Sequence, residues 1–212
     1  MSTSTPYWPA PPDRYPGDLP DRADVVVVGG GITGVSLMHH LGKAGIDAVL
    51  VERNHLAAGA SGRNAGFLLA GVADCYAEAV RIFGRARTRD IWSMTEENHI
   101  EEIAAVAGQD IGYRRQGSVV LASGPKEAEH LAESAVLMTE DGFHCTWDGS
   151  RLVNPGDGEV THRWAGTMGF TESGLPLIGP VEGMANVHVC AGYNGHGMGF
   201  AFMSAKHLVS SL

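Results

Sequence analysis

The hydrophobic pattern of the chain divides it into stretches with different periodicities. Residues 25–28 are four consecutive valines, and such a β-branched run is typical of a strand buried on both faces of a parallel sheet. Residues 32–41 carry apolar side chains at helical spacing, and Gly45 stands where a left-handed C-cap would end this helix. A second strand is predicted at residues 48–52, so the order strand, helix, strand indicates a βαβ unit.

The pattern predicts further elements after this unit. In chain order they are one or two helices in residues 73–106, a strand in residues 118–121, a helix in residues 126–140, a strand in residues 186–190 and a closing helix that runs to about residue 210. Gly84 is expected to interrupt the first helical region and Gly108 to end it. A glycine-rich turn, residues 192–199, opens the closing helix.

Composition narrows the class of protein. The 212 residues include 29 glycines, 44% are hydrophobic, and no apolar run is long enough to span a membrane, so we expect a folded protein without a membrane span. The net charge of −9 and the lack of a basic cluster argue against nucleic acid as a partner. The scattered cysteines (Cys75, Cys145 and Cys190) and the absence of a signal-peptide pattern predict a cytoplasmic location.

The N-terminal stretch, residues 1–22, is rich in proline. Six of the ten prolines fall within the first twenty residues, a density that excludes helix and favours an extended arm. Tyr7 and Trp8 are apolar enough to dock this arm on the body of the protein, although a loose tail is an equal alternative.

A glycine fingerprint lies between the first predicted strand and helix. Residues 29–34 satisfy the pattern GxGxxG, directly follow a buried strand and open an amphipathic helix, and Glu52 ends the next strand. In a dinucleotide site the glycines permit a tight turn and a close approach of the pyrophosphate, the helix N-terminus holds the phosphates, and the carboxylate accepts hydrogen bonds from a ribose diol. The alternative is a glycine-rich turn beside a surface glutamate. The acidic residue favours FAD or NAD over NADP.

Later segments resemble one family of flavoproteins. Glu52-Arg53 followed by residues 59–66, together with residues 164–170, 174–180 and 191–199, is similar to the D-amino-acid oxidase type (DAO) family of FAD-dependent oxidoreductases. The nearest branch is the one that contains glycine, sarcosine and γ-glutamylputrescine oxidases. The resemblance implies FAD as the cofactor and a Rossmann-like α/β fold.

The resemblance assigns roles to these segments. Arg63 would be a fixed cation near the phosphates or the flavin, Ser61 and Asn64 would donate to the flavin edge, and the backbone at His196 would stabilise negative charge at the flavin N1 and C2 carbonyl. Alternatively, Ser61 or Asn64 caps a following helix. The residues predicted to bind the cofactor are Gly29, Gly31, Ile32, Thr33, Gly34, Glu52, Arg53, Ser61, Arg63, Asn64, Ala65, Gly66, Gly195, His196, Gly197 and Met198.

The chain departs from this family at one place. Residues 156–160 resemble a segment that normally leads into an intervening stretch, but residues 161–164 of the closing block follow at once, which indicates an internal deletion. The expected domains are an N-terminal arm at residues 1–22, an FAD-binding domain built from residues 23–72 and 161–212, and a truncated α+β substrate-side lobe at residues 73–160. Loss of an inner strand would expose apolar surface and unpaired backbone.

The predicted function is oxidation of the C–N bond of an amine or amino acid by hydride transfer to flavin N5. Oxygen or another acceptor would reoxidise the flavin, and no side chain is assigned as catalytic. The alternatives are a catalytically defective FAD-binding remnant that acts through association, which includes self-association, and an NAD-dependent dehydrogenase. No metal site is expected, because His39 and His40 are adjacent on a helix without a suitably spaced third ligand, and we expect both to be partly exposed.

Overall fold

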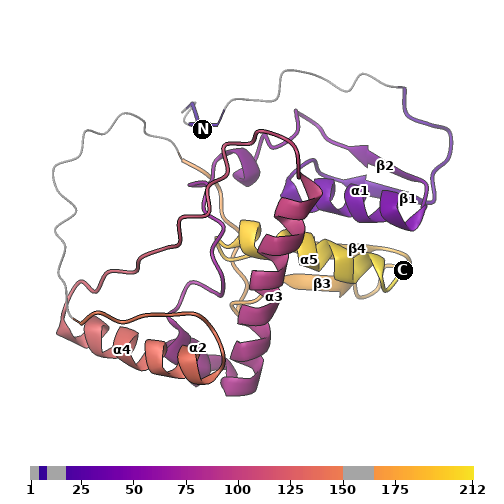
Figure 1. Ribbon diagram of the computed structural model, residues 1–212. Coiled ribbons are helices and arrows are strands. Elements are labelled where there is room, and N and C mark those ends of the chain that lie inside the picture. Colours follow the sequence, from indigo (N-terminus) through magenta and orange to yellow (C-terminus); the bar gives the residue numbers. More distant parts are fainter. Residues whose placement is uncertain (1–4, 9–17, 150–164) are drawn as a thin grey trace. The chain divides into compact units, whose positions relative to one another are not determined.

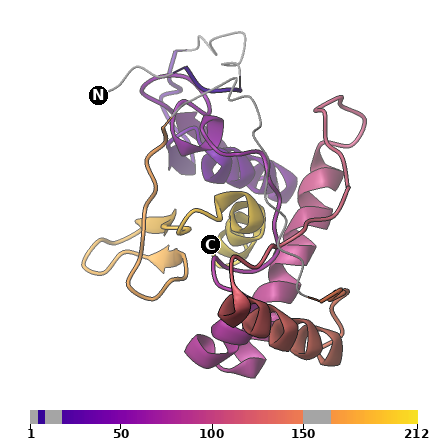
Figure 2. The ribbon, with the colours of Figure 1, turned by 90° about the vertical axis from the view of Figure 1, so that its left-hand side faces the viewer.

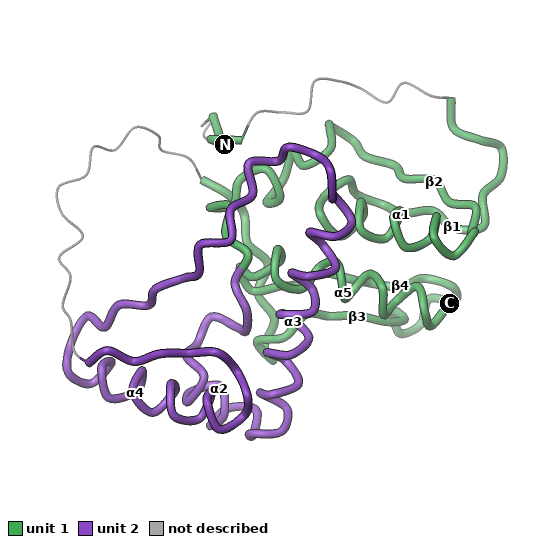
Figure 3. The backbone as a smooth tube through the Cα atoms, viewed as in Figure 1, with its two compact units in different colours: residues 1–68, 160–212 green, residues 69–159 purple. Residues whose placement is uncertain are grey.

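The computed structural model describes residues 5–8, 18–149 and 165–212 (Figure 1). The chain contains both helices and strands and divides into two compact units, residues 1–68 with 160–212 and residues 69–159 (Figure 3). Most of the proline-rich arm, the predicted deletion junction at residues 156–161 and Trp164 lie outside the described residues.

The first unit begins with the predicted strand, helix and strand. Strand β1 (Val25–Val28) pairs in parallel with β2 (Ala48–Val51), with Val25 opposite Ala48, and α1 (Ile32–Ala44) connects them. Gly45 adopts the left-handed conformation at φ 72° and donates its N–H to the carbonyl of Leu41, so it ends α1 as a C-cap. These three elements and the cap confirm the prediction.

The burial of β1 differs from the prediction. Only Val27 is buried, in contact range of the start of α1, whereas Val26 is 58% exposed and Val28 is 83% exposed. Successive side chains of a strand point to opposite faces, and only one face of this two-stranded sheet is covered by α1. The expectation of a strand buried on both faces was therefore wrong, because such burial needs a second covering layer that the described residues do not supply.

The C-terminal part of this unit is a hairpin followed by a helix. β3 (Leu177–Pro180) pairs antiparallel with β4 (His188–Ala191), and α5 (Gly197–Val209) follows the glycine-rich turn. The sequence predicted β4 and α5 but not β3. Helices α1 and α5 lie side by side (Figure 2), and the side chain of His40 is buried between them, with Nε2 donating to the carbonyl of Phe202 at 3.2 Å. His40 is therefore not partly exposed as expected.

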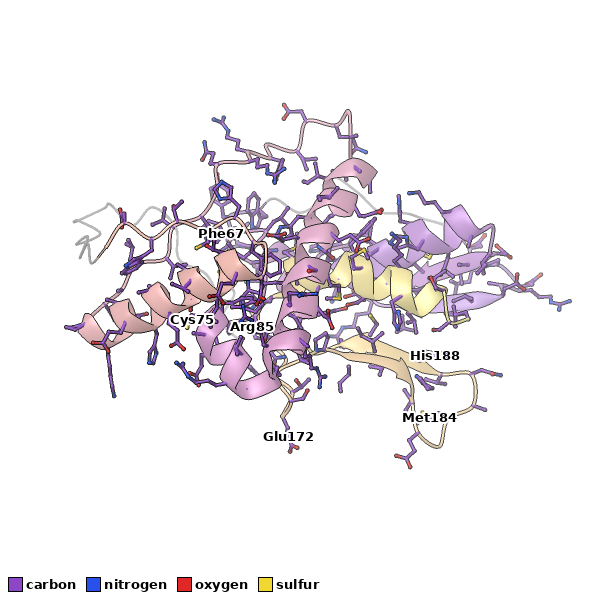
Figure 4. All side chains as sticks on the ribbon, turned by 60° about the horizontal axis from the view of Figure 1, so that its bottom comes forward. Phe67, Cys75, Arg85, Glu172, Met184 and His188 are labelled. Carbon is purple, nitrogen blue, oxygen red and sulfur yellow. The ribbon has the colours of Figure 1, made fainter. Side chains whose placement is uncertain are left out.

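The second unit is helical. Its helices are α2 (Tyr76–Phe83), α3 (Arg85–Ala105) and α4 (Pro125–Glu140), with Gly84 between the first two as predicted. The buried ring of Tyr76 packs edge-on against Trp92 at a centroid distance of 4.9 Å, and its hydroxyl donates to Asp141 at 2.7 Å. Arg85, labelled in Figure 4 at the start of α3, donates to the same carboxylate at 3.0 Å and so joins the end of α4 to this core.

One predicted strand does not form. Residues 118–121 have no regular secondary structure, and Val119, Val120 and Leu121 are 84%, 68% and 44% exposed. A β-branched run favours an extended strand only when a neighbouring strand can pair with it, and neither sheet in the described part of the chain includes this segment. Among the described residues, no helix has the length and apolar character needed to cross a membrane.

Candidate functional site

The glycine loop turns tightly between β1 and α1. Gly29 has φ 106°, which favours glycine, and its N–H donates to the carbonyl of Val51 at 2.8 Å. A Cβ on Gly34 would overlap the carbonyl oxygen of Gly29, so the first turn of α1 lies directly against the loop. The N-cap of α1 is Gly31, which has no side chain, and the first turn contains no acidic residue. The first turn of α1 therefore adds no negative charge to the positive end of this helix.

Glu52 lies beside this loop at the end of β2. Its Oε2 accepts a hydrogen bond from the N–H of Gly30 and its Oε1 accepts one from the N–H of Asn54, each at 2.8 Å. These hydrogen bonds, first the one from Gly30, lower the pKa of the carboxyl, so Glu52 is held as a carboxylate. Each carboxylate oxygen can accept a second hydrogen bond, so the half-buried side chain keeps acceptor capacity toward solvent or a ligand.

The second predicted segment folds against the start of α1. The short helix η1 (Ala60–Gly62) presents Ser61, whose Oγ accepts a hydrogen bond from the N–H of Ile32 at 2.8 Å. Asn64 closes its own turn, since Nδ2 donates to the carbonyl of Ser61 at 2.6 Å and Oδ1 accepts from the N–H of Gly66 at 2.7 Å. Ser61 thus satisfies a free N–H of an earlier helix, whereas the alternative interpretation expected it to cap a later one.

Arg63 connects the second segment to the closing block. Its Nη1 donates to the carbonyl of Ala165 at 2.9 Å, and a Cβ on Gly166 would lie 3.1 Å from Cβ of Arg63. Arg53, next to Glu52, is exposed and adds a smaller electrostatic contribution that lowers the pKa of that carboxyl. The charge of Arg63 therefore lies where the two chain segments meet.

The edge of this second segment contacts the N-terminal arm. Ala65 and Gly66 are exposed, and Gly66 has φ 77° with the ring of Trp8 packed against its Cα. The indole nitrogen of Trp8 donates to the carbonyl of Asn64 at 2.9 Å. Of the two alternatives for Tyr7 and Trp8, the structure therefore shows the docked one.

The closing turn precedes α5 and is held by Asn194. Its backbone N–H donates to the carbonyl of Gly169 at 3.1 Å, while its side chain oxygen accepts from the N–H of Thr171 at 2.8 Å. Gly195 follows with φ 87°, and His196 is the N-cap of α5. Nδ1 of the His196 ring lies 3.4 Å from the carbonyl oxygen of Asn194. Gly197 and Met198 then form the first turn of α5, which has no acidic residue.

Tyr193 joins the closing turn to the glycine loop, a role that the sequence did not indicate. Its hydroxyl accepts a hydrogen bond from Oγ1 of Thr33 at 3.1 Å and lies 3.2 Å from Sγ of Cys190. Burial raises the pKa of Tyr193 and of Cys190, so both groups stay protonated at neutral pH. The only sequence signal was an aromatic residue inside a glycine-rich turn, which by itself does not name its partner.

The structure therefore brings three distant segments to the start of α1. Ser61 contacts it from the second segment, Tyr193 from the closing turn, and Glu52 contacts the preceding loop. The hairpin that leads into the closing turn extends away from the turn, with Met184 and His188 at its far end (Figure 4). One cavity, of about 420 Å³, lies elsewhere, in the second unit between α4 and Trp147, and none of the predicted cofactor-binding residues lines it.

Two comparisons relate the chain to known proteins. A family model, DAO, described as FAD dependent oxidoreductase, matches residues 24–152 and 136–211. Dimethylglycine dehydrogenase, mitochondrial, from Rattus norvegicus is 32% identical over 137 residues, which are 62% of this chain and 14% of that protein. Gamma-glutamylputrescine oxidoreductase from Escherichia coli (strain K12) is 45% identical over 67 residues, 30% of this chain and 16% of that protein.

A third relative covers a similar stretch. 4-Methylaminobutanoate oxidase (formaldehyde-forming) from Paenarthrobacter nicotinovorans is 28% identical over 130 residues, 61% of this chain and 14% of that protein. The matched part thus spans between 14% and 16% of the length of these three relatives. No solved structure matches the chain.

Proposed function

Because the chain belongs to the DAO family of FAD-dependent oxidoreductases, we propose that it binds FAD in a Rossmann-like domain built from both ends of the sequence. This domain would comprise residues 23–72 and 161–212, and residues 73–160 would form a reduced substrate-side lobe. The proposal is supported by the parallel β1-α1-β2 unit and by a compact unit that contains residues from both ends of the chain.

The observation that carries the proposal is the convergence of three segments on the start of α1. The first turn of α1 has no acidic residue, and the loop before it lies so close to the helix that a Cβ on Gly34 would overlap the loop. The Glu52 carboxylate is ionised beside this loop. A bound pyrophosphate is stabilised by the positive end of a helix dipole and needs a backbone that it can approach closely, while a ribose diol donates hydrogen bonds to a carboxylate. These residues therefore fit the adenosine diphosphate half of FAD.

The remaining predicted residues would serve the flavin half. Arg63 supplies a fixed cation from the second segment, and the first turn of α5, with His196 as its N-cap, supplies backbone N–H groups without an opposing acidic charge. FAD, when bound, supplies the hydride acceptor at its N5 position. The residues named here bind and orient it, and none of them is proposed as a general acid or base.

The proposed substrate class is a small amine or amino acid. Dimethylglycine, γ-glutamylputrescine and 4-methylaminobutanoate, which name the three relatives, all carry an amine nitrogen. The reaction would remove a hydride from the carbon beside that nitrogen, the imine would be hydrolysed by water, and oxygen or another acceptor would take the electrons. The second candidate is an FAD-binding remnant without turnover, which would follow from an internal deletion at residues 156–161.

Purification of the chain and its absorption spectrum test the proposal. We expect a yellow protein, or a colourless one that becomes yellow with added FAD, whose flavin absorbance is bleached by a tertiary amine such as dimethylglycine under anaerobic conditions. Flavin binding without bleaching by any amine in a panel would favour the remnant. A folded chain that ignores saturating FAD would refute both.

A matched pair of variants locates the site. Glu52→Gln should weaken FAD binding, because the amide cannot accept as strongly from a ribose diol. The control is Glu127→Gln, since Glu127 is also a carboxylate that caps a backbone N–H, that of Ser123 at 2.7 Å, but lies in the second unit. Equal FAD affinity of the two variants would contradict the assignment of Glu52.

A further inference from the structure

The loop at residues 59–66 has little apolar anchoring of its own. Its side chains are small or polar, and none of the residues of η1 within it is buried. Phe67, which follows the loop and is labelled in Figure 4, is 67% exposed. Ser61 ties the beginning of the loop to α1, whereas the side chain of Asn64 closes its own turn. The end of the loop therefore gains from a contact that comes from elsewhere in the chain.

Trp8 supplies such a contact at the end of the loop. Its indole Nε1 donates to the carbonyl of Asn64 at 2.9 Å, and the benzene ring of the indole lies against Gly66. A Cβ on Gly66 would overlap this ring, and the three atoms nearest to that position all belong to Trp8. The φ of 77° at Gly66 also favours glycine. Glycine at this position thus serves two needs, that of the backbone and that of the ring.

The ring of Trp8 is held although the residues around it form no regular secondary structure. Trp8 is 37% exposed, so most of its surface is covered, and Tyr7 packs edge-on against it at a centroid distance of 5.0 Å. A largely covered tryptophan provides a wide apolar contact together with one hydrogen-bond donor. Because Trp8 belongs to the same chain as the loop, its effective concentration at the loop is on the order of millimolar.

We propose that Trp8 is a positioning residue of the cofactor site, which holds Asn64, Ala65 and Gly66 in the conformation that binds FAD. The inference rests on the proposed function, in which these three residues bind the cofactor. Trp8 acts through the loop and needs no contact with FAD itself. Without the ring the loop populates further conformations, and the observed dissociation constant rises in inverse proportion to the fraction of molecules that remain competent to bind.

Two substitutions of Trp8 test this role. Trp8→Ala removes the ring and its N–H group and should raise the dissociation constant of FAD about tenfold, as measured by flavin fluorescence titration. Trp8→Phe keeps an apolar ring for Gly66 and should recover part of this loss. In the absence of FAD, the amide of Gly66, which donates to Oδ1 of Asn64, should exchange hydrogen faster in Trp8→Ala than in the unaltered chain.

Trp147→Ala is the matched control. Trp147 is 38% exposed, close to the value for Trp8, and lies in the second unit, which contains none of the predicted cofactor-binding residues. This variant loses the same side chain and should bind FAD like the unaltered chain. Circular dichroism of both variants shows that each is folded under the conditions of the titration.

A double-variant cycle shows whether Trp8 acts through Gly66. Gly66→Ala displaces the ring and strains the backbone in the unaltered chain, whereas after Trp8→Ala only the backbone strain remains. The strain is common to both backgrounds and cancels in the comparison. Gly66→Ala should therefore raise the dissociation constant of FAD by a factor about ten times larger in the unaltered chain than in Trp8→Ala.

Four results would overturn the inference. If the unaltered chain and Trp8→Ala bind FAD equally well, Trp8 does not position the loop, although the proposed function stands. If Gly66→Ala has the same effect in both backgrounds, Trp8 does not act through Gly66. If Trp147→Ala weakens FAD binding as much as Trp8→Ala, the loss is general. A folded chain that binds no FAD would refute the proposed function and the inference together.

Discussion

Replacement of Gly34 by alanine perturbs the contact between the glycine loop and α1. A Cβ at this position would meet the carbonyl oxygen of Gly29 at less than 3.0 Å and would also lie 3.4 Å from Cγ1 of Val27. The obstructing atom is backbone, which cannot turn aside as the end of a side chain can. Either the loop or the first turn of α1 must move, and overpacking of this kind costs about 3 kcal/mol of the free energy of unfolding.

Gly42→Ala is the matched control within the same helix. Nothing lies within 4 Å of a Cβ on Gly42, so this variant adds a methyl group to α1 without a clash. Alanine is the better helix former, and the control should gain about 0.5–1 kcal/mol. The two variants should therefore differ by roughly 3–4 kcal/mol although their chemical change is the same.

Urea unfolding followed by circular dichroism measures this difference, and FAD absorbance after gel filtration measures cofactor retention. We expect Gly34→Ala to unfold at lower urea and to lose FAD under conditions in which it is still folded, because displacement of the loop removes the close approach to a pyrophosphate. Gly42→Ala should retain FAD like the unaltered chain. Equal stability and equal retention in both variants would refute the packing argument and the role of the loop.

Three further predictions concern pH and hydrogen bonding. Burial raises the pKa of Glu102 from 4.5 to about 7. This carboxyl therefore contributes stability below pH 4.5, at most about 3 kcal/mol, and the contribution is lost as the pH rises through 7. Glu102→Gln should remove this loss when the free energy of unfolding is measured with urea at pH 5 and pH 8, and an unchanged dependence of stability on pH would contradict the prediction. Burial, and then the charge of His39, lowers the pKa of His40. The contribution of neutral His40 to stability is therefore present above pH 6.5 and is lost as the pH falls through the lowered pKa of the folded state. His40→Gln should keep a donor to the α5 backbone and make the melting temperature fall less steeply with acid, and an equally steep fall would disprove this. Tyr193→Phe should cost about 1 kcal/mol in thermal unfolding and weaken FAD binding, because it removes the hydroxyl that accepts from Thr33; unchanged FAD affinity would show that the closing turn is positioned without it.

Much of the local structure followed from the sequence. The valine run predicted β1, apolar spacing predicted α1, and Gly45 predicted its C-cap, because each of these depends on the conformational preferences of neighbouring residues. The helices on both sides of Gly84 and the one that ends at Glu140 followed in the same way. The glycine fingerprint and Glu52 could also be predicted from the sequence, since the glycines follow the first strand of the βαβ unit and Glu52 follows the second.

The partners of the candidate site could not be read in this way. The contact of Ser61 with Ile32 and that of Tyr193 with Thr33 join residues far apart in sequence. A hydroxyl group can donate to or accept from many groups, so the sequence around it does not predict its partner. The buried position of His40 likewise depended on α5, which supplies the carbonyl of Phe202 from the other end of the chain.

The sequence by itself determined the helices, the strands β1, β2 and β4 and the position of the glycine loop, because steric preference and hydrophobic period act over a few residues. Only the tertiary structure decided how these elements are covered and paired. The valines of β1 are exposed on one face and residues 118–121 pair with no strand in the described part of the chain, although both have the composition of buried strands. Burial and strand pairing require a second surface, and the presence of that surface is a property of the whole fold rather than of the segment that needs it.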